Sequence, residues 1–387
     1  MDIIIIGAGL AGSAAAWAAT RRGLSVLLLE AFPAGHKRGS SHGSARIFRR
    51  AYPDPLYVGL TGQAGELWRR LEDEAAEPLL RLTGGVDFGQ RRDPGRLHAV
   101  LTASGVPAEL LSPAAAAERW PGISFATASG GPVMFHAESG VLDPDRAMAA
   151  MLRLAAERGA DVRFETPVTG LTATTGGDGA VVRTGSGTFT APTVVVSAGA
   201  WLAPLAGDLV PLPELRVTQQ QVFHFAPREA PAEQPAEQPA EQPAGAWPIF
   251  ICQDGAEYFY GLPGGRDGGV PGAIKLGENN HGTPATADGR DFTVDPGARQ
   301  RAIAFADSRL PGLNSAPVNE VTCLYTSTAN DDFILDRQGP FVIASACSGH
   351  GAKFAPLLGE IIAGLAAGEP SPDPRFTLAG HRLSASQ

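Results

Sequence analysis

The sequence has few residues that could stabilise the fold by covalent or metal cross-links. It contains three cysteines, which are widely spaced and include no Cys-x-x-Cys pair: Cys252, Cys323 and Cys347. An odd number at this spacing argues against both a disulfide framework and a zinc site. We therefore expect no bound metal and a reducing compartment, the cytoplasm.

An excess of positive charge is also missing. The formal net charge is −9 at pH 7, and lysine is scarce. The only clustered basic stretch runs from Lys37 and Arg38 to Arg46, Arg49 and Arg50. Because this stretch is too short for a nucleic-acid-binding arm, no nucleic-acid partner is expected.

Long uninterrupted apolar runs are absent as well. The apolar stretch near the N-terminus is interrupted by Arg21 and Arg22 and lacks the basic start of a signal peptide. No association with a membrane is expected. With 387 residues, 44% of them hydrophobic, the chain can bury a large core divided over two or three domains.

The first residues show the pattern of a β-α-β unit. Residues 3–6 are four isoleucines, as in a strand that is buried on both faces. A glycine-rich turn follows, then a helix predicted over 14–22 and a second buried strand over 26–29. This pattern predicts an α/β fold that opens with a parallel sheet.

The glycines of this turn have the spacing of a dinucleotide-binding motif. Gly7 permits the tight turn, Gly9 lets the backbone approach a pyrophosphate, and Gly12 allows the helix to pack closely on the strand. The free amides at the helix start attract phosphate. Glu30, at the end of the second strand, can accept a ribose hydroxyl. The motif alone does not separate NAD from FAD.

Further along the chain, helices are predicted over 57–78, 147–158 and 354–367, with buried strands over 193–197 and 341–345. Alternating patches between 211 and 319 predict a mostly antiparallel sheet. We expect a discontinuous Rossmann-type domain with an inserted α+β domain: 1–84, 142–210 and 320–387 form the first, and 85–141 and 211–319 the second. Prolines repeat in a Glu-Gln-Pro-Ala tract and predict a mobile loop over 229–245.

Several segments together resemble the monomeric sarcosine oxidases and N-methyltryptophan oxidases, within the FAD-dependent amino acid oxidase superfamily. They follow the order of that family along nearly the whole chain: Gly39-Ser-Ser-His-Gly-Ser-Ala-Arg46-Ile-Phe-Arg49-Arg-Ala-Tyr52, Arg119-Trp-Pro-Gly-Ile123, Ser139-Gly-Val141, Lys275-Leu-Gly277, Cys323-Leu-Tyr325-Thr and Ser348-Gly-His-Gly-Ala-Lys353-Phe. The resemblance selects FAD as the cofactor.

The resemblance also implies a set of site residues. Cys323 corresponds to the cysteine that binds the flavin 8α-methyl group covalently, and Lys275 to the lysine over the flavin that activates oxygen. Arg49 and Lys353 correspond to the pair that binds the substrate carboxylate. Further residues are implied in the substrate cavity (Tyr260, Tyr325) and around the FAD (His42, Ser41, Arg46, Val168, Gly199, Gly349, Gly351).

The residues themselves leave other interpretations open. Buried free cysteines are usually inert, so Cys323 alone would be interpreted as structural. Lys275 could point outward from an alternating strand. Arg46, Arg49 and Arg50 could form a solvated patch, and Arg50, which has no place in the family motif, is expected to be solvated.

Some positions depart from the sarcosine oxidases, which puts sarcosine itself in doubt as the substrate. Asn279 stands where they have a histidine, and His281 lies two residues further along. Cys347 replaces a bulky residue, and Ile251 lies at a position that lines the cavity.

The expected activity is therefore the oxidation of an N-methyl or cyclic secondary amino acid by a monomeric enzyme. Hydride passes to the flavin, the imine hydrolyses, and O2 is reduced to hydrogen peroxide. Two alternatives stay open: a primary amino acid oxidase or dehydrogenase of the same fold that uses another electron acceptor, and a non-catalytic flavin-binding protein.

Overall fold

The computed structural model describes residues 1–127, 130–229, 246–279 and 282–384. Most of the predicted mobile loop, residues 230–245, lies outside the described residues, and so does His281. No helix among the described residues is long and apolar enough to cross a membrane.

The predicted β-α-β unit is confirmed. Strand β1 (Ile3–Ile6), helix α1 (Leu10–Arg21) and strand β2 (Val26–Leu29) follow one another, and β1 pairs in parallel with β2. The helix begins four residues earlier than the predicted range of 14–22. Gly12 lies inside the first turn of the helix, where the absence of a side chain lets the helix pack closely on the strand. The glycine therefore does not mark the start of the helix.

In the described part of the chain, six strands form the sheet that contains β1, here called the central sheet. Their order is β20-β21-β13-β1-β2-β9, and all pairs except β20–β21 are parallel. The strands not yet introduced are β9 (Asp161–Arg163), β13 (Thr193–Val196), β20 (Ile334–Gln338) and β21 (Phe341–Ser345). The α/β class and the buried strands predicted over 193–197 and 341–345 are thus confirmed.

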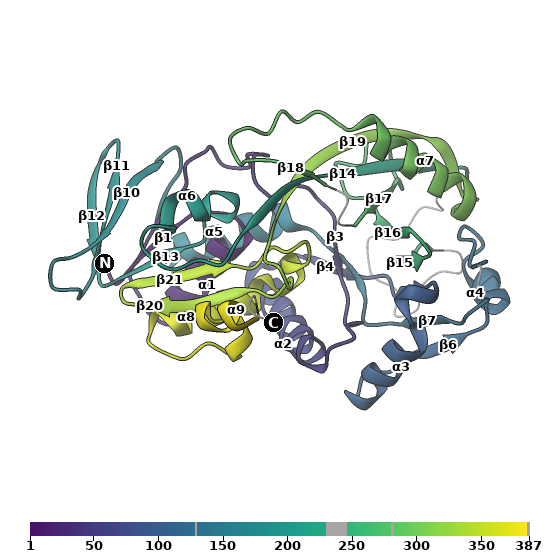
Figure 1. Cartoon of the computed structure of the whole chain (residues 1–387), viewed down its shortest axis with the longest axis horizontal. Helices are drawn as coiled ribbons and strands as arrows, with labels where there is room; N and C mark the ends of the chain where they lie inside the picture. Colours follow the sequence, from purple (N-terminus) through teal and green to yellow (C-terminus); the bar gives the residue numbers. More distant parts are fainter. Residues whose placement is uncertain (128–129, 230–245, 280–281, 385–387) are drawn as a thin grey trace.

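The two faces of the central sheet are covered differently (Figure 1). Ile3 and Ile5 pack with helices α1, α2 (Pro55–Ala75), α5 (Pro144–Glu157) and α8 (Ala355–Ala366). Ile4 and Ile6 pack against the other side, which is formed by α6 (Leu202–Ala206) and a small antiparallel sheet of β10 (Val168–Ala173), β11 (Ala180–Thr184) and β12 (Gly187–Ala191).

A second sheet, here called the large sheet, forms the other half of the molecule (right in Figure 1). Its strand order is β18-β14-β17-β16-β15-β5-β7-β6, and β19 pairs with β14. The strands are β5 (Gly85–Phe88), β6 (Glu109–Leu111), β7 (Val133–His136), β14 (Arg216–Pro227), β15 (Ile249–Asp254), β16 (Glu257–Pro263), β17 (Ile274–Glu278), β18 (Thr283–Pro284) and β19 (Leu313–Ser327). It is mostly antiparallel, as the alternating sequence patches predict; β5 and β15 are parallel.

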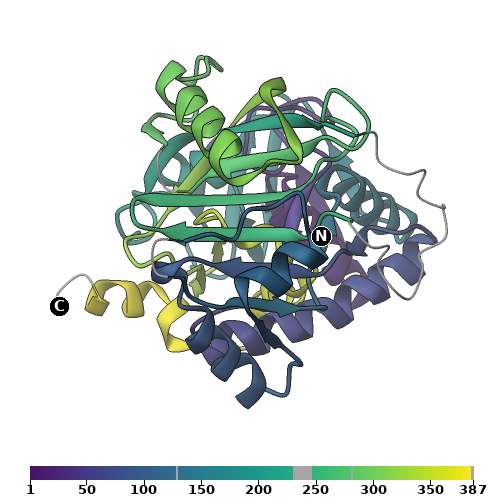
Figure 2. The same cartoon turned by 90° about the vertical axis from the view of Figure 1, so that its right-hand side faces the viewer.

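Alternation along these strands separates a core face from a polar face. Phe223 and Leu276 belong to an aromatic-rich core that packs on α7 (Pro296–Arg309), which lies over the strands in Figure 2. Their neighbours His224 and Lys275 are cross-strand partners, so their side chains point to the opposite face. That polar face is turned toward the central sheet.

The remaining elements are short. They are β3 (Arg46–Phe48), β4 (Leu80–Leu82) and β8 (Gly140–Leu142), which pair together, and α3 (Pro94–Ala103), α4 (Pro113–Arg119) and α9 (Leu378–Ser384), with single 3-10 turns at Gln90–Arg92, Gly199–Trp201, Gly351–Phe354 and Pro374–Phe376. Strand β19 runs through the predicted boundary at 319/320. The division into two domains remains a prediction.

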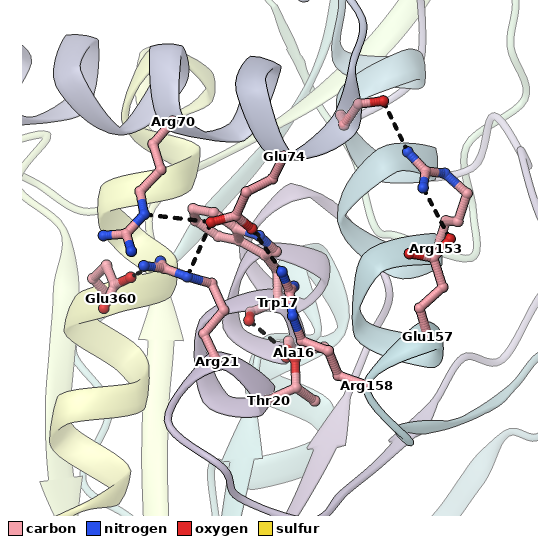
Figure 3. A network of polar contacts seen from close by, with 11 residues as sticks. Ala16, Trp17, Thr20, Arg21, Arg70, Glu74, Arg153, Glu157, Arg158 and Glu360 are labelled. Atoms are coloured by element: carbon pink, nitrogen blue, oxygen red, sulfur yellow. Dashed lines mark hydrogen bonds and ion pairs between the residues drawn. The ribbon is translucent and has the colours of Figure 1, made fainter.

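Helices α1, α2, α5 and α8 are joined by a polar network centred on Glu74 (Figure 3). The Glu74 carboxylate accepts hydrogen bonds from Trp17 Nε1 at 2.9 Å and Arg158 Nη2 at 2.8 Å, and it pairs with Arg21 Nε at 3.3 Å. Arg21 also reaches Glu360 on α8. Partial burial raises the pKa of Glu74, but the Trp17 and Arg158 contacts outweigh it and lower the pKa below 4.5.

We predict that Glu74→Gln lowers the free energy of unfolding by about 1–2 kcal/mol, because a carboxylate that accepts from the buried Trp17 indole N–H is lost. Urea unfolding monitored by circular dichroism measures this difference.

The effect of Glu74→Gln should also depend on pH. Since the pKa of Glu74 is lowered in the folded protein, the carboxylate stabilises the fold above its ordinary pKa of 4.5. The difference in stability between the two proteins should therefore shrink as the pH falls below that value. The matched control is Glu157→Gln, which removes an exposed pair with Arg153 and should change stability by less than about 0.5 kcal/mol. Equal losses in both variants would contradict the role of the network.

Candidate active site

A large cavity lies between the two sheets and has a volume of about 1510 Å³. This exceeds the roughly 300–1000 Å³ of an ordinary small-molecule pocket, so a dinucleotide and a second small molecule fit together. Of the residues expected at the site, all but Gly12 line it: Gly7, Gly9, Glu30, Ser41, His42, Arg46, Arg49, Val168, Gly199, Tyr260, Lys275, Cys323, Tyr325, Gly349, Gly351 and Lys353. Ile251, Asn279 and Cys347 also line it.

The glycine-rich turn forms one end of the cavity. Gly7 has a φ of +98°, a backbone angle that residues with a side chain rarely adopt. A Cβ at this position would lie 2.7 Å from the carbonyl oxygen of Ser197. Gly12 lies behind the turn, where a Cβ would meet the Gly7 oxygen at 1.8 Å. Any side chain at either position would displace the turn from the sheet.

The same end of the cavity suits a pyrophosphate. The N-cap residue of helix α1 is Gly9, which has no side chain to cap the first amides, and Gly7 to Ala11 face the cavity. Of the first amides, that of Leu10 donates to Ser41 Oγ at 3.1 Å. A helix start with its positive dipole end toward an open cavity can bind an anion.

Glu30 lies beside this turn and is held in a fixed position. Its carboxylate accepts from the amides of Ala8 at 2.7 Å and Phe32 at 3.0 Å. Burial raises the pKa of Glu30, but hydrogen bonds from His36 and the two amides outweigh it and lower the pKa below its ordinary value. The group is therefore ionised and oriented next to the cavity. Together with the glycine turn, Glu30 provides the cradle that an adenine dinucleotide such as FAD requires.

Cys323 lies at the opposite end of the cavity, on the polar face of the large sheet. Its side chain is only 7% exposed, and burial raises the pKa of the thiol. Arg46, Lys275 and Arg290 lie close enough to oppose this shift. Cys252, by contrast, lies on the core face and packs among aromatic side chains. Of these two cysteines, only Cys323 meets the cavity.

Lys275 points into the cavity and is buried, which rules out the outward-facing interpretation. Its Nζ donates to the carbonyl oxygen of Ala45 at 3.1 Å. Burial and the nearby Arg46 guanidinium lower the pKa of Lys275 to about 7, although the Asp267 carboxylate partly offsets them. The pKa of Asp267, raised by burial, is nevertheless lowered to about 2 by Lys275 and by hydrogen bonds from Ser44.

Arg49 and Lys353 converge on the ring of Tyr52. The Arg49 Cζ lies 4.3 Å from the ring centroid and the Lys353 Nζ 5.8 Å from it. Lys353 Nζ also donates to His350 O at 2.7 Å, and Arg49 donates to the carbonyl of Ala51. Burial, and secondly Arg49, lowers the pKa of Lys353 well below its ordinary value. No carboxylate pairs with either cation among the described residues, so the pair is open to an anion.

Tyr260 and Tyr325 lie together near Cys323, each over a glycine. A Cβ on Gly277 would lie 2.4 Å from the Tyr260 hydroxyl, and one on Gly349 would lie 2.4 Å from the Tyr325 ring. The two glycines therefore make room for the two rings. Burial and the neighbouring Cys323 raise the pKa of Tyr260 to about 12, so its hydroxyl stays protonated.

His42 and Arg46 line the middle of the cavity. The Arg46 guanidinium donates to the carbonyl oxygens of Ala45 at 2.9 Å, Ser40 at 3.2 Å and His42 at 2.7 Å, which fixes this loop. Burial and Arg46 lower the pKa of His42 to about 3, so its ring is neutral.

Arg50 is a correction to the sequence-based expectation. It is not solvated: its Nη1 pairs with Glu138 at 2.5 Å and its side chain is only 15% exposed. A carboxylate 88 positions away in the sequence makes the pair, and no local pattern signals it.

The sequence patterns also missed two charged or titratable residues of the large-sheet half. Arg92 lines the cavity, and its Nε contacts Asp87 Oδ1 at 2.5 Å. His224 is fully buried directly opposite Lys275, and burial followed by Lys275 lowers its pKa to about 4. A single sequence gives neither the strand register that places His224 beside Lys275 nor the position of the turn that brings Arg92 to the cavity.

Comparison with known proteins decides the family. The model of the family described as FAD dependent oxidoreductase matches residues 2–365. The chain belongs to this family. It is therefore an FAD-dependent oxidoreductase, and the glycine turn, Glu30 and the adjoining cavity provide the fit that the cofactor needs.

Relatives of this oxidoreductase confirm the resemblance seen in the sequence. It is 33% identical to the monomeric sarcosine oxidase of Streptomyces avermitilis, over 100% of this chain and 98% of the relative. It is 32% identical to the N-methyl-L-tryptophan oxidase of Citrobacter koseri, over 99% of this chain and 98% of that relative.

Solved structures confirm the fold. NikD, an unusual amino acid oxidase of nikkomycin biosynthesis, superposes in its open form with a TM-score of 0.82 at 24% identity, over 97% of this chain and 96% of the other. The L-proline dehydrogenase of P. horikoshii superposes with the same TM-score of 0.82 at 20% identity, over 100% and 98% of the two chains.

We predict that Gly12→Ala reduces the FAD content of the purified oxidoreductase severely, because the added methyl group would overlap the Gly7 carbonyl at 1.8 Å. The ratio of flavin to protein absorbance measures the loss. Gly59→Ala is the matched control, since this exposed glycine inside α2 has no atom within 4 Å of a Cβ. The control should keep its FAD and gain about 0.5–1 kcal/mol of stability. Full FAD content in Gly12→Ala would contradict the packing account.

Proposed function

We propose that this oxidoreductase oxidises a secondary amino acid, N-methylated or cyclic, and uses O2 as the electron acceptor. The substrate C–N bond becomes an imine, which water hydrolyses, and the two electrons pass through FAD to O2 to give hydrogen peroxide. The relatives named for sarcosine and N-methyl-L-tryptophan support this substrate class.

The open cation pair of Arg49 and Lys353 is the observation that carries the proposal. Both side chains line the cavity, and neither has an acidic partner among the described residues. Buried charges are normally paired, and an arginine binds a carboxylate through two parallel hydrogen bonds. The carboxylate of an amino acid completes this pair. The Tyr52 ring beneath both cations fixes their positions.

The cavity around this pair suits a neutral amine. Tyr260 and Tyr325 stay protonated, because burial raises the pKa of both hydroxyls. FAD supplies the two-electron chemistry when it is bound. The residues of the chain hold the carboxylate, exclude water and leave the amine nitrogen without a competing anion.

Lys275 is proposed to assist the reaction with O2. It is a buried ammonium group on the polar face of the large sheet, next to Arg46 and Cys323 in the cavity. A fixed positive charge stabilises negative charge that develops on oxygen during its reduction. The neighbouring Asp267 helps to keep Lys275 charged.

Cys323 is proposed as the covalent attachment point of FAD, through a thioether. Its position at the end of the cavity and the three cations Arg46, Lys275 and Arg290 support the proposal, since cations favour the reactive thiolate. The free cysteines also favour a reducing, cytoplasmic location, and we propose a monomer, as the name of the S. avermitilis relative suggests.

We predict that acid denaturation leaves the flavin on the wild-type polypeptide and releases it from Cys323→Ala. Acid precipitation followed by absorbance of the pellet and supernatant measures this. Cys252→Ala is the matched control: this cysteine is also buried but lies on the core face, so the flavin should stay attached. Release of all flavin from the wild-type protein would contradict covalent attachment at Cys323.

We predict that Lys275→Met slows reoxidation by O2 about 100-fold or more and slows anaerobic reduction by substrate far less. Stopped-flow absorbance follows the two half-reactions separately. Because the pKa of Lys275 is lowered to about 7, the wild-type rate with O2 should decrease as the pH rises through 7, and this dependence should vanish in the variant. Lys37→Met, which removes an exposed lysine, is the control and should resemble the wild type. Equal losses in both half-reactions would count against the role in oxygen reduction.

A further inference from the structure

Arg92 brings a third cation to the part of the cavity that holds Arg49 and Lys353. It lies in the 3-10 turn Gln90–Arg92, is 9% exposed and lines the cavity. It belongs to none of the sequence segments that resemble the family, so the proposed function leaves it without a role.

Two contacts fix the Arg92 guanidinium and leave one edge open. Nε contacts Asp87 Oδ1 at 2.5 Å, and Nη2 donates to the carbonyl oxygen of Ala51 at 3.2 Å. Among the described residues, no acceptor is paired with Nη1. Asp87 is fully buried in β5, directly opposite Ile251, whose side chain lines the cavity. The carboxylate therefore orients the guanidinium from behind, and Nη1 is the nitrogen left for a ligand.

The position of Arg92 relative to Arg49 limits the size of that ligand. The carbonyl oxygen of Ala51 accepts a hydrogen bond from Arg49 Nη1 as well as from Arg92 Nη2. Two guanidinium groups that share one acceptor lie within a few ångströms of each other. Two anionic groups that bind one arginine each must then be separated by a short carbon chain.

Charge balance favours two anionic groups over one. When Arg49, Lys353 and Arg92 are all ionised, Asp87 is the one carboxylate paired with any of them among the described residues. Two positive charges are left in excess in a largely buried site, and buried charges need partners. The carboxylate of an ordinary amino acid compensates one of them. A second carboxylate on the same substrate compensates the other.

Neutral polar groups complete this wall of the cavity. Gln253 on β15 and Tyr258 on β16 are cross-strand partners, and both line the cavity. They offer hydrogen bonds without adding charge.

We propose that the substrate is a short dicarboxylic amino acid, N-alkylated in the way of N-methylaspartate or N-methylglutamate, and that Arg92 binds its side-chain carboxylate. This inference rests on the proposed function, because it takes Arg49 and Lys353 as the site of the α-carboxylate. Arg92 is then a specificity residue, held in place by Asp87.

Ligand binding tests the inference without turnover. Glutarate and pentanoate have the same number of carbons and differ by one carboxylate, and isothermal titration of the FAD-loaded enzyme compares them. We expect glutarate to bind at least about tenfold more tightly than pentanoate, because its second carboxylate makes one additional charge-assisted contact. Equal affinities would overturn the inference.

Variants assign the preference to Arg92. Since Arg92→Met alone would leave Asp87 buried and unpaired, the double variant Arg92→Met/Asp87→Leu removes both charges. We expect this variant to lose the preference for glutarate and to keep its affinity for pentanoate. Arg92→Lys should keep part of the preference. Arg91→Met, in the same turn but exposed, is the matched control and should keep all of it. If the double variant instead lost affinity for glutarate and pentanoate to the same extent, Arg92 would bind the same carboxylate as Arg49. This result would also overturn the inference.

Turnover separates this inference from the proposed function. N-methyl-L-glutamate should reduce the flavin with a kcat/KM at least about tenfold above that of N-methyl-L-norvaline, and the double variant should abolish the difference. If neither compound reduces the flavin while glutarate still binds preferentially, the proposed function fails and the dicarboxylate site stands. If both compounds are oxidised equally well, the inference of a dicarboxylate site fails and the proposed function stands.

Discussion

The register of the large sheet decides which side chains reach the cavity. Its strands alternate between a core face with Phe223, Leu276 and Cys252, and a polar face with His224, Lys275 and Cys323. A shift of one residue in any strand would exchange the two faces and bury the reactive groups in the aromatic core. The core side is therefore as important to the chemistry as the cavity side, because its packing against α7 prevents that shift.

The two ends of the cavity use different parts of the chain. At the end formed by the central sheet, the cavity is lined by backbone: a helix start with glycine as its N-cap residue, and glycines that admit no Cβ. At the other end, long cationic side chains come from segments far apart in sequence: Lys275 from β17 of the large sheet, Arg49 from the chain after β3, and Lys353 from the 3-10 turn before α8. Burial lowers the pKa of both Lys275 and Lys353, and an anion bound beside either lysine would favour its charged form.

The sequence predicts the first end better than the second. The turn from Gly7 to Gly12 and Glu30 follow from local rules, and both lie where the pattern puts them. Period-two alternation shows that Lys275 faces away from its apolar neighbours, but it does not show which face meets the cavity. For Cys323 and Lys353, the resemblance to the family predicted that the side chains reach the cavity. Neither approach finds Arg92, Asp87 or the Arg50–Glu138 pair, since these contacts depend on where β5, its loop and the β7–β8 connection lie in space.

We propose that Arg49 and Lys353 hold an amino acid against the FAD held by the glycine turn. Anaerobic mixing of the FAD-loaded enzyme with a series of N-methyl and cyclic amino acids tests it most directly, with the flavin absorbance as the signal. The account predicts bleaching of the flavin band by at least one of these acids, and no bleaching by the corresponding amines that lack the carboxylate. Bleaching by the amines at the same rate, or by none of the compounds, would contradict it.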